Sequence, residues 1–143
     1  MSGGREYPDR PWVGIGVVAF SADRVLLVQR GKPPRLGQWS LPGGAQHLGE
    51  RAEAAARREL LEEAGIEVGP LELAAVVDAV VRDEDGRVRF HYTIVDYRGR
   101  HAAGEARPGD DVAAVAWAAP EELAAFDLTP EVLRVISLAR AGL

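Results

Sequence analysis

Cysteine is missing from this 143-residue chain. Without a thiol, the protein can form no disulfide bond, bind no zinc ion through cysteine and use no cysteine as a nucleophile. Long apolar runs are missing too: none could span a bilayer, and the first residues lack the apolar core of a signal peptide. These absences predict a cytoplasmic protein with no membrane partner.

Positive charge is in deficit, with 17 lysines and arginines against 22 acidic residues. The net charge of −5 and the lack of a polybasic tail argue against nucleic acid as a partner. A small anionic molecule would therefore need a local basic patch or a metal ion to be attracted.

The order of apolar and polar segments predicts one domain over residues 1–143, with 1–11 as a loose, polar lead-in. Short β-branched segments predict strands, and segments rich in alanine and glutamate predict helices. The predicted strands are 12–20, 25–30, 76–82, 87–97 and 112–118; the predicted helices are 52–64 and two that open at Pro120 and Pro130; the predicted loops are 31–38 and 98–111. This order favours an α/β or α+β sandwich with a mixed sheet.

Three glutamates, Glu59, Glu62 and Glu63, lie close together near the end of the central predicted helix. The second and third follow the first by three and four positions, so all three share one helix face. Like charges at this spacing cost roughly 0.2–0.5 kcal/mol per pair unless a positive charge lies among them. A hard divalent cation such as Mg²⁺ or Mn²⁺ would supply it, because these ions prefer carboxylate oxygens. Taken alone, the run also fits a solvated helix surface.

The spacing of residues 44–66 is more specific than the charge run. Gly44 is followed by Glu50, Arg58, Glu59, Leu60, Glu62, Glu63, Gly65 and Ile66. At each defining position this segment resembles the signature of the Nudix hydrolase family. The local chemistry agrees, because residues 42–44 signal a turn, residues 52–64 favour a helix, and Gly65 suits the left-handed cap of a helix.

The resemblance implies an α/β/α sandwich and the hydrolysis of a pyrophosphate linkage in a nucleoside diphosphate joined to another group. It implies Mg²⁺ as cofactor, with Mn²⁺ as a substitute, held by Glu59, Glu62 and Glu63 and by the main-chain carbonyl of Gly44. One of these carboxylates, or one from a loop, would act as general base.

The resemblance gives Arg58 and Glu50 a different role in catalysis. The two side chains would pair, hold the loop against the helix and orient the acidic groups. The alternative is a surface ion pair between Arg58 and Glu62, one helical turn further on.

Candidates for substrate contact lie outside this segment. Residues 25–49 contain no acidic residue but include Arg30, Lys32 and Arg35, a local positive stretch that suits a diphosphate. Arg30 is the strongest candidate because it ends a predicted strand, while a solvated loop is the alternative. Asp111 precedes the last predicted strand, where the resemblance implies a further carboxylate and an ordinary turn acid is equally compatible.

The substrate is a separate question. Residues 12–35 and 91–97 are similar to small ADP-ribose pyrophosphatases, although Arg82 stands where many of these have proline. ADP-ribose is therefore the favoured substrate, and a nucleoside triphosphate pyrophosphatase is the alternative. A module that senses a nucleotide without cleaving it is a third reading, which the intact glutamates disfavour. The family often dimerises, so a homodimer is also a candidate assembly.

Overall fold

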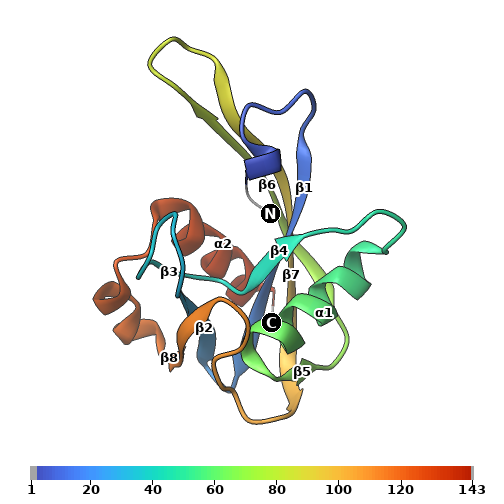
Figure 1. Ribbon diagram of the computed structural model, residues 1–143. Coiled ribbons are helices and arrows are strands. Elements are labelled where there is room, and N and C mark those ends of the chain that lie inside the picture. The colour runs from blue at the N-terminus through green and yellow to red at the C-terminus, as the bar shows by residue number, and fades with distance from the viewer. Residues whose placement is uncertain (1–2, 143) are drawn as a thin grey trace.

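A computed structural model describes residues 3–142 and places eight strands in one sheet, flanked by two α-helices and two 3₁₀ segments (Figure 1). The strands are β1 (Trp12–Ser21), β2 (Arg24–Arg30), β3 (Trp39–Ser40), β4 (Gly43–Ala45), β5 (Glu67–Val68), β6 (Glu72–Arg82), β7 (Val88–Ala103) and β8 (Val112–Ala118). The helical segments are η1 (Gly3–Arg5), α1 (Ala52–Ala64), η2 (Pro120–Phe126) and α2 (Pro130–Ala141). Among the described residues, no helix has the length and apolar character that crossing a membrane requires.

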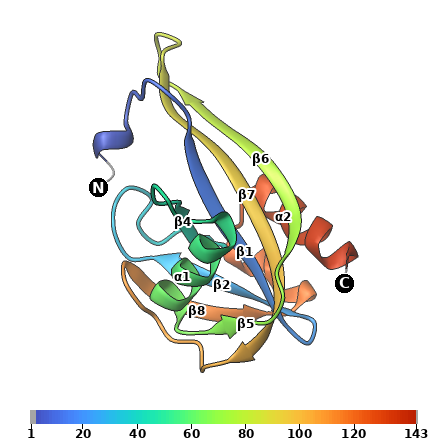
Figure 2. The same cartoon turned by 90° about the vertical axis from the view of Figure 1, so that its right-hand side faces the viewer.

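The sheet is mixed, as predicted. Its main strand order is β3-β2-β1-β7-β5, with β4 beside β1, β6 beside β7 and β8 beside β2. β1 and β7 run parallel from the Trp12–Tyr92 pair to the Phe20–Arg100 pair, and the other pairings are antiparallel. Helices α1 and α2 cover opposite faces of the sheet (Figure 2), which makes the predicted three-layer sandwich.

Side-chain alternation along β1 builds both halves of the core. Ile15, Val17 and Ala19 pack against α1, whereas Val18 and Phe20 pack on the face that α2 covers. All five are at most 2% exposed, because β1 is a central strand with a helix on each side. The sequence run that predicts a buried strand is therefore apolar at nearly every position.

β1 and β2 separate after a short contact, and β4 pairs with β1 beyond the point of separation. They pair only at Phe20–Val25 and Ser21–Arg24, and β4 then pairs with β1 through residues 43–45. Gly43 is required there, because a Cβ at this position would collide with the carbonyl of Ile15. The separation of β1 and β2 thus places the turn at residues 42–44 alongside α1.

Helix α1 has the predicted bounds. It buries Ala55, Ala56, Leu60 and Ala64, so three of its four core contacts are made by small side chains that allow close packing on the sheet. Gly65 ends it in the left-handed conformation, with φ of 71° and an N–H that donates to the carbonyl of Leu61.

The prediction of a loop over residues 98–111 is wrong in its first half, since β7 continues to Ala103. Arg98 and Arg100 made this stretch appear loop-like, but in the structure they extend from a strand whose Gly99 is buried against Val68 and Leu71. Pairing with β1 and β5 satisfies the main chain there, so the true loop begins at Gly104.

Within the lead-in predicted for residues 1–11, Glu6 and Tyr7 make specific contacts. The Tyr7 N–H donates to the carbonyl of Arg89 at 2.7 Å, its hydroxyl donates to Asp83 at 2.8 Å, and Glu6 forms an ion pair with Arg89 at 2.7 Å. The segment thus lies against the β6–β7 hairpin (Figure 1). Residues 1 and 2 lie outside the described part of the chain.

The remaining helices and strands are largely of the predicted type but differ from the prediction in length. The second hairpin is longer than predicted, because β6 starts at Glu72 and not at residue 76. The helix opened by Pro120 is a 3₁₀ helix, and α2 begins where Pro130 predicts, with the Thr129 hydroxyl accepting from the Val132 N–H. The short strands β3, β4 and β5 were not predicted.

Candidate active site

Arg58 joins the loop before α1 to the acidic face of that helix. Its guanidinium donates to the Glu50 carboxylate from Nε at 2.7 Å and from Nη2 at 3.1 Å. Nη1 donates to Glu59 at 2.8 Å and to Glu62 at 3.3 Å, and Nη2 also donates to the Ala45 carbonyl at 3.1 Å. Both predicted pairings of Arg58 are present, and the shorter, bidentate one is with Glu50.

The Glu50 carboxylate is held in place by two hydrogen-bond donors. It accepts from Arg58 and also from the main-chain N–H of His47 at 3.0 Å. These two hydrogen bonds lower the pKa of Glu50 to about 2, so the group is ionised at neutral pH. A permanently charged Glu50 can hold the guanidinium in one orientation.

Two glycines of β4 approach the glutamates of α1 closely. The Gly43 N–H donates to the Glu63 carboxylate at 2.8 Å, and a Cβ on Gly44 would collide with the Glu59 carboxyl. Burial raises the pKa of Glu63 to about 7, although the Gly43 N–H opposes this, and the neighbouring Glu59 raises it further. The site therefore carries more negative charge than Arg58 alone neutralises.

Glu62 lies at the outer edge of the same face, with its side chain 43% exposed. The carbonyls that end α1 are capped by the loop that follows β7. Gly109 donates its N–H to the Glu63 carbonyl at 2.9 Å, and Asp110 donates to the Glu62 carbonyl at 3.1 Å. This loop fixes the turn of helix that carries two of the three glutamates.

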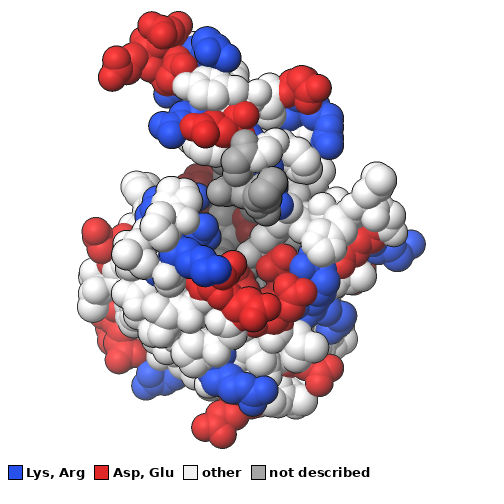
Figure 3. Space-filling view, viewed as in Figure 1, with Lys and Arg blue, Asp and Glu red and all other residues white. Residues whose placement is uncertain are grey.

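Basic side chains flank the acidic patch (Figure 3). Arg30 donates from Nε to the Pro34 carbonyl at 2.6 Å, and its charge lowers the pKa of Glu63, so the two groups are neighbours. Lys32 pairs with Asp111 at 2.7 Å, and the Lys32 ammonium holds the pKa of the Asp111 carboxyl below its ordinary value.

Arg35 lies in the loop between β2 and β3. It lines a hollow of about 550 Å³ together with Trp39 and Phe126, whose rings meet edge to face at 4.9 Å. Of the predicted substrate residues, the structure thus places Arg30 near Glu63, Asp111 in an ion pair with Lys32 and Arg35 in the lining of the hollow beside Trp39.

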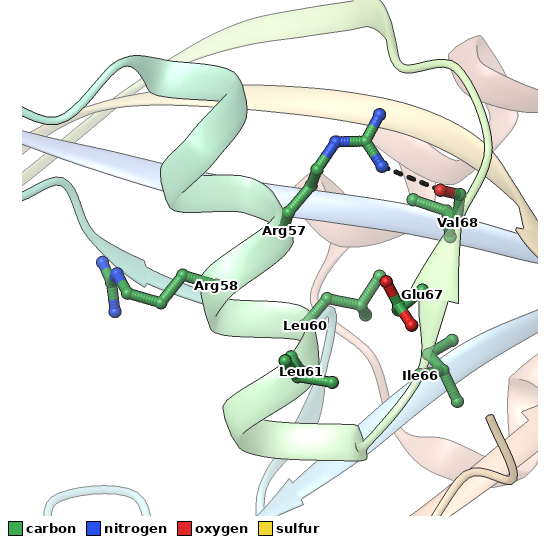
Figure 4. Close-up of a pocket in the computed structure, with 7 residues that line it drawn as sticks. All are labelled: Arg57, Arg58, Leu60, Leu61, Ile66, Glu67 and Val68. Carbon is green, nitrogen blue, oxygen red and sulfur yellow. Dashed lines mark hydrogen bonds between the residues drawn. The ribbon is translucent and has the colours of Figure 1, made fainter. Parts of the chain in front are cut away.

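A second, smaller cavity of about 160 Å³ lies behind α1, against β5 (Figure 4). Leu60, Leu61 and Ile66 contribute to its lining, and Arg57 donates to the Val68 carbonyl at 2.7 Å on that side. Arg58 points away from β5 (Figure 4) and donates to Glu50 and Glu59. The two consecutive arginines therefore serve opposite sides of one helix.

Comparison with known proteins agrees with this geometry. A family model described as NUDIX domain matches residues 10–138, which is most of the chain. The chain belongs to the Nudix family. A Mycobacterium tuberculosis protein named "Putative 8-oxo-dGTP diphosphatase 2" is 41% identical over 107 residues, covering 74% of this chain and 72% of that protein. A Methanocaldococcus jannaschii protein named ADP-ribose pyrophosphatase is 34% identical over 101 residues, covering 71% of this chain and 57% of that protein.

Solved Nudix structures share the fold. A MutT NUDIX hydrolase from Burkholderia pseudomallei superposes with a TM-score of 0.79 at 31% identity, covering 91% of this chain and 98% of that one. The NUDIX domain of Shewanella oneidensis NrtR, solved with ADP ribose, superposes with a TM-score of 0.78 at 25% identity, covering 94% and 90%. As a Nudix protein, the chain is a pyrophosphohydrolase that acts on nucleotide anhydride bonds.

Nudix proteins generally use a divalent metal ion, and the donors found here fit one. Carboxylate oxygens at Glu59, Glu62 and Glu63 and the nearby carbonyl of Gly44 are hard ligands of the kind that Mg²⁺ prefers. Burial is the main reason for the raised pKa of Glu63, and the neighbouring Glu59 and Glu62 add to it. Among the described residues, no three acidic, histidine or cysteine side chains are grouped closely enough to hold a metal ion by themselves.

Sequence reasoning missed two features of this Nudix site. One is the Gly43 N–H that donates to Glu63, which depends on how β4 pairs with β1. The other is the loop at residues 107–110, whose N–H groups cap the end of α1. The run of two glycines before the helix hinted at the first, while the second has no local sequence signal.

Proposed function

We propose that this Nudix protein hydrolyses the pyrophosphate bond of a nucleoside diphosphate derivative with Mg²⁺ as cofactor. One observation carries the proposal: the half-buried Glu63 carboxylate lies beside Glu59 on the turn of α1 that Arg58 and Glu50 hold in place. Such clustered negative charge is costly without a cation, because two carboxylates in a poorly solvated site repel each other.

The site residues divide into three roles under this proposal. Glu59, Glu62 and Glu63 would hold Mg²⁺ together with the Gly44 carbonyl. When bound, the ion neutralises phosphate oxygens and lowers the pKa of water. Glu50 and Arg58 are positioning residues, because they fix the carboxylates through hydrogen bonds. Arg30 and, at the rim, Asp111 with its partner Lys32 would meet the substrate, with Arg35 as a more distant candidate.

We propose a nucleoside triphosphate as the first candidate substrate, with monophosphate and pyrophosphate as products. The more identical of the two relatives above carries the name of an 8-oxo-dGTP diphosphatase, and this chain spans more of its length. ADP-ribose is the second candidate, supported by residues 91–97, by the M. jannaschii relative and by the NrtR domain that binds ADP ribose. A homodimer and a cytoplasmic location remain predictions.

The decisive experiment is product analysis on purified protein with Mg²⁺, using deoxynucleoside triphosphates and ADP-ribose in parallel with Glu63→Gln. A triphosphate cleaved to monophosphate and pyrophosphate would support the first candidate, and ADP-ribose cleaved to AMP and ribose phosphate the second. Nucleotide binding without turnover of any substrate would overturn the catalytic proposal in favour of a sensing module.

A further inference from the structure

Asp111 is bound to the segment that directly follows β2 through both its main chain and its side chain. Its carbonyl accepts from the Gly31 N–H at 2.8 Å, and its carboxylate forms an ion pair with Lys32 at 2.7 Å. The residue adopts the left-handed conformation, with φ of 60°, which aspartate enters more readily than most side chains do. Asp111 is therefore fixed to the two residues that come immediately after Arg30.

The turn over residues 109–111 is also bound to helix α1. The N–H groups of Gly109 and Asp110 donate to the carbonyls of Glu63 and Glu62, at 2.9 and 3.1 Å. This turn thus lies between the end of β2 and the last turn of α1 (Figure 1). A displacement of the turn would move the end of β2 relative to the glutamates.

The pairing of β2 with β8 is irregular at Arg30. Gln29 pairs with Ala114 and Arg30 pairs with Val112, which leaves Ala113 as an extra residue in β8. A β-bulge of this kind bends the strand and often redirects a side chain beside an active site. The direction of the Arg30 side chain therefore depends on how the preceding turn leads into β8.

Arg30 lies close to carboxylates of both the helix and the turn. Burial raises the pKa of Glu63 and the Lys32 ammonium lowers that of Asp111, and in both cases the charge of Arg30 also acts to lower the pKa. The Arg30 Nε donates to the Pro34 carbonyl at 2.6 Å. A small change in the direction of Arg30 would therefore change its distance from Glu63.

The ion pair between Lys32 and Asp111 is exposed to solvent. Its side chains are 66% and 55% exposed, and ion pairs of this kind add little to stability because water screens the charges. Removing the pair should therefore change the stability of the fold only slightly, so that an effect on activity would report on Arg30.

We propose that Asp111 is a positioning residue, which fixes Arg30 for contact with the substrate phosphates through Gly31 and Lys32. The Asp111 carboxylate then serves Lys32 and is not a ligand of the metal ion, which distinguishes its role from that of the glutamates. This role adds to the place of Asp111 at the rim of the site. The proposal rests on the substrate contact proposed above for Arg30.

The test is a double-mutant cycle of Lys32→Gln, Asp111→Asn and both together, with kcat, KM and the Mg²⁺ dependence measured on the substrate that wild type cleaves best. Asparagine tolerates the left-handed conformation, so the cycle removes the ion pair and keeps the main-chain bond to Gly31. Each single variant should raise KM roughly 10-fold, less than the ~100-fold that a misplacement of about 1 Å can cost, while kcat and the half-saturating Mg²⁺ concentration change little. Because the pair acts as a unit, the double variant should match the single variants.

Arg24→Gln is the matched control. Arg24 begins β2, at the end opposite Arg30, and pairs with Glu122 at 3.0 Å, with side chains 50% and 48% exposed. The two ion pairs are similar in length and exposure, but this one does not adjoin Arg30. Arg24→Gln and Asp111→Asn should lower the thermal midpoint slightly and to a similar extent, whereas Arg24→Gln should keep the wild-type KM.

Calorimetric binding of inorganic pyrophosphate with Mg²⁺ separates this proposal from the catalytic one. Weaker pyrophosphate binding by Asp111→Asn than by wild type would support the positioning role even if no nucleotide is hydrolysed. Equal pyrophosphate binding, a higher Mg²⁺ requirement in Asp111→Asn, or single effects that multiply in the double variant would overturn it. If Asp111→Asn fails to fold, Lys32→Gln alone should give the same rise in KM, and an unchanged KM there would refute the proposal.

Discussion

Replacing Arg58 by lysine tests whether the arginine positions the acidic groups or merely balances their charge. Lysine keeps the positive charge but has one nitrogen, which cannot span Glu50, Glu59 and the Ala45 carbonyl as the guanidinium does. The bidentate contact with Glu50, at 2.7 and 3.1 Å, would be lost first. The Glu59 carboxylate and the loop before α1 would then no longer be held together.

The expected size of the effect on Mg²⁺ dependence and kcat follows from the contacts that Arg58→Lys removes. Substitutions of groups that orient metal ligands typically cost about 10- to 100-fold in metal affinity or activity. We therefore expect Arg58→Lys to raise the Mg²⁺ concentration needed for half-maximal activity by roughly 10-fold or more and to lower kcat. A titration of turnover against Mg²⁺, supported by calorimetric Mg²⁺ binding, measures both effects.

Arg57→Lys is the matched control. Arg57 occupies the preceding position of α1 but donates to the Val68 and Gly69 carbonyls on the other side of the helix, at 2.7 and 3.0 Å (Figure 4). This variant should lose some thermal stability and keep the wild-type Mg²⁺ dependence. If Arg58→Lys also keeps the wild-type Mg²⁺ dependence and kcat, charge alone is sufficient and the positioning role is refuted.

Three further outcomes are expected. Glu63→Gln should keep its fold and lose turnover by roughly 100-fold or more. In EDTA at pH 8 its thermal unfolding midpoint should be higher than that of wild type, because the substitution removes a charge from a poorly solvated position. A midpoint below that of wild type would contradict this reasoning. Gly44→Ala should displace the Glu59 carboxyl, cost about 1–3 kcal/mol in chemical denaturation and weaken Mg²⁺ binding. Burial raises the pKa of Asp96 to about 6 from the usual 3.8, so its protonated form stabilises the native state below pH 4 and that stability is lost as the pH rises through 6. At pH 8, Asp96→Asn should therefore unfold at a higher temperature than wild type, and its free energy of unfolding should be greater by roughly 2–3 kcal/mol. At pH 4 the two proteins should differ little.

Local sequence signals identified much of the fold and the residues of the proposed site. The bounds of α1 follow from its helix formers and from Gly65, and the three glutamates share a face because of helical periodicity. The pairing of Arg58 with Glu50 follows from the family resemblance, and the structure contains it. In each case the interacting residues lie within one segment of about 25 positions.

Features that depend on distant strand pairing were not readable from the sequence. The extension of β7 to Ala103 depends on its register with β1, some 80 positions earlier, which overrides the polar character of residues 98–103. The docking of residues 3–11 depends on contacts of Tyr7 with the tip of the second hairpin. The same holds for Asp96, whose burial follows from lying between β1 and β6, because nothing in its local sequence distinguishes it from a surface aspartate.

Glu63 and Asp96 differ in the hydrogen bonds and charges that surround their carboxyl groups. Burial raises the pKa of both carboxyls, but their surroundings differ. Glu63 receives one N–H, from Gly43, and lies among other carboxylates, so a cation is the partner that reduces its cost. Asp96 receives no hydrogen bond from the described part of the chain, and the charges that act on it are those of Glu131 and Arg134 on α2. Gly43 and Gly16 lie between them. The raised pKa therefore has different consequences at the two positions: a bound cation would lower the pKa of Glu63, whereas the pKa of Asp96 is set by burial and by the charges on α2.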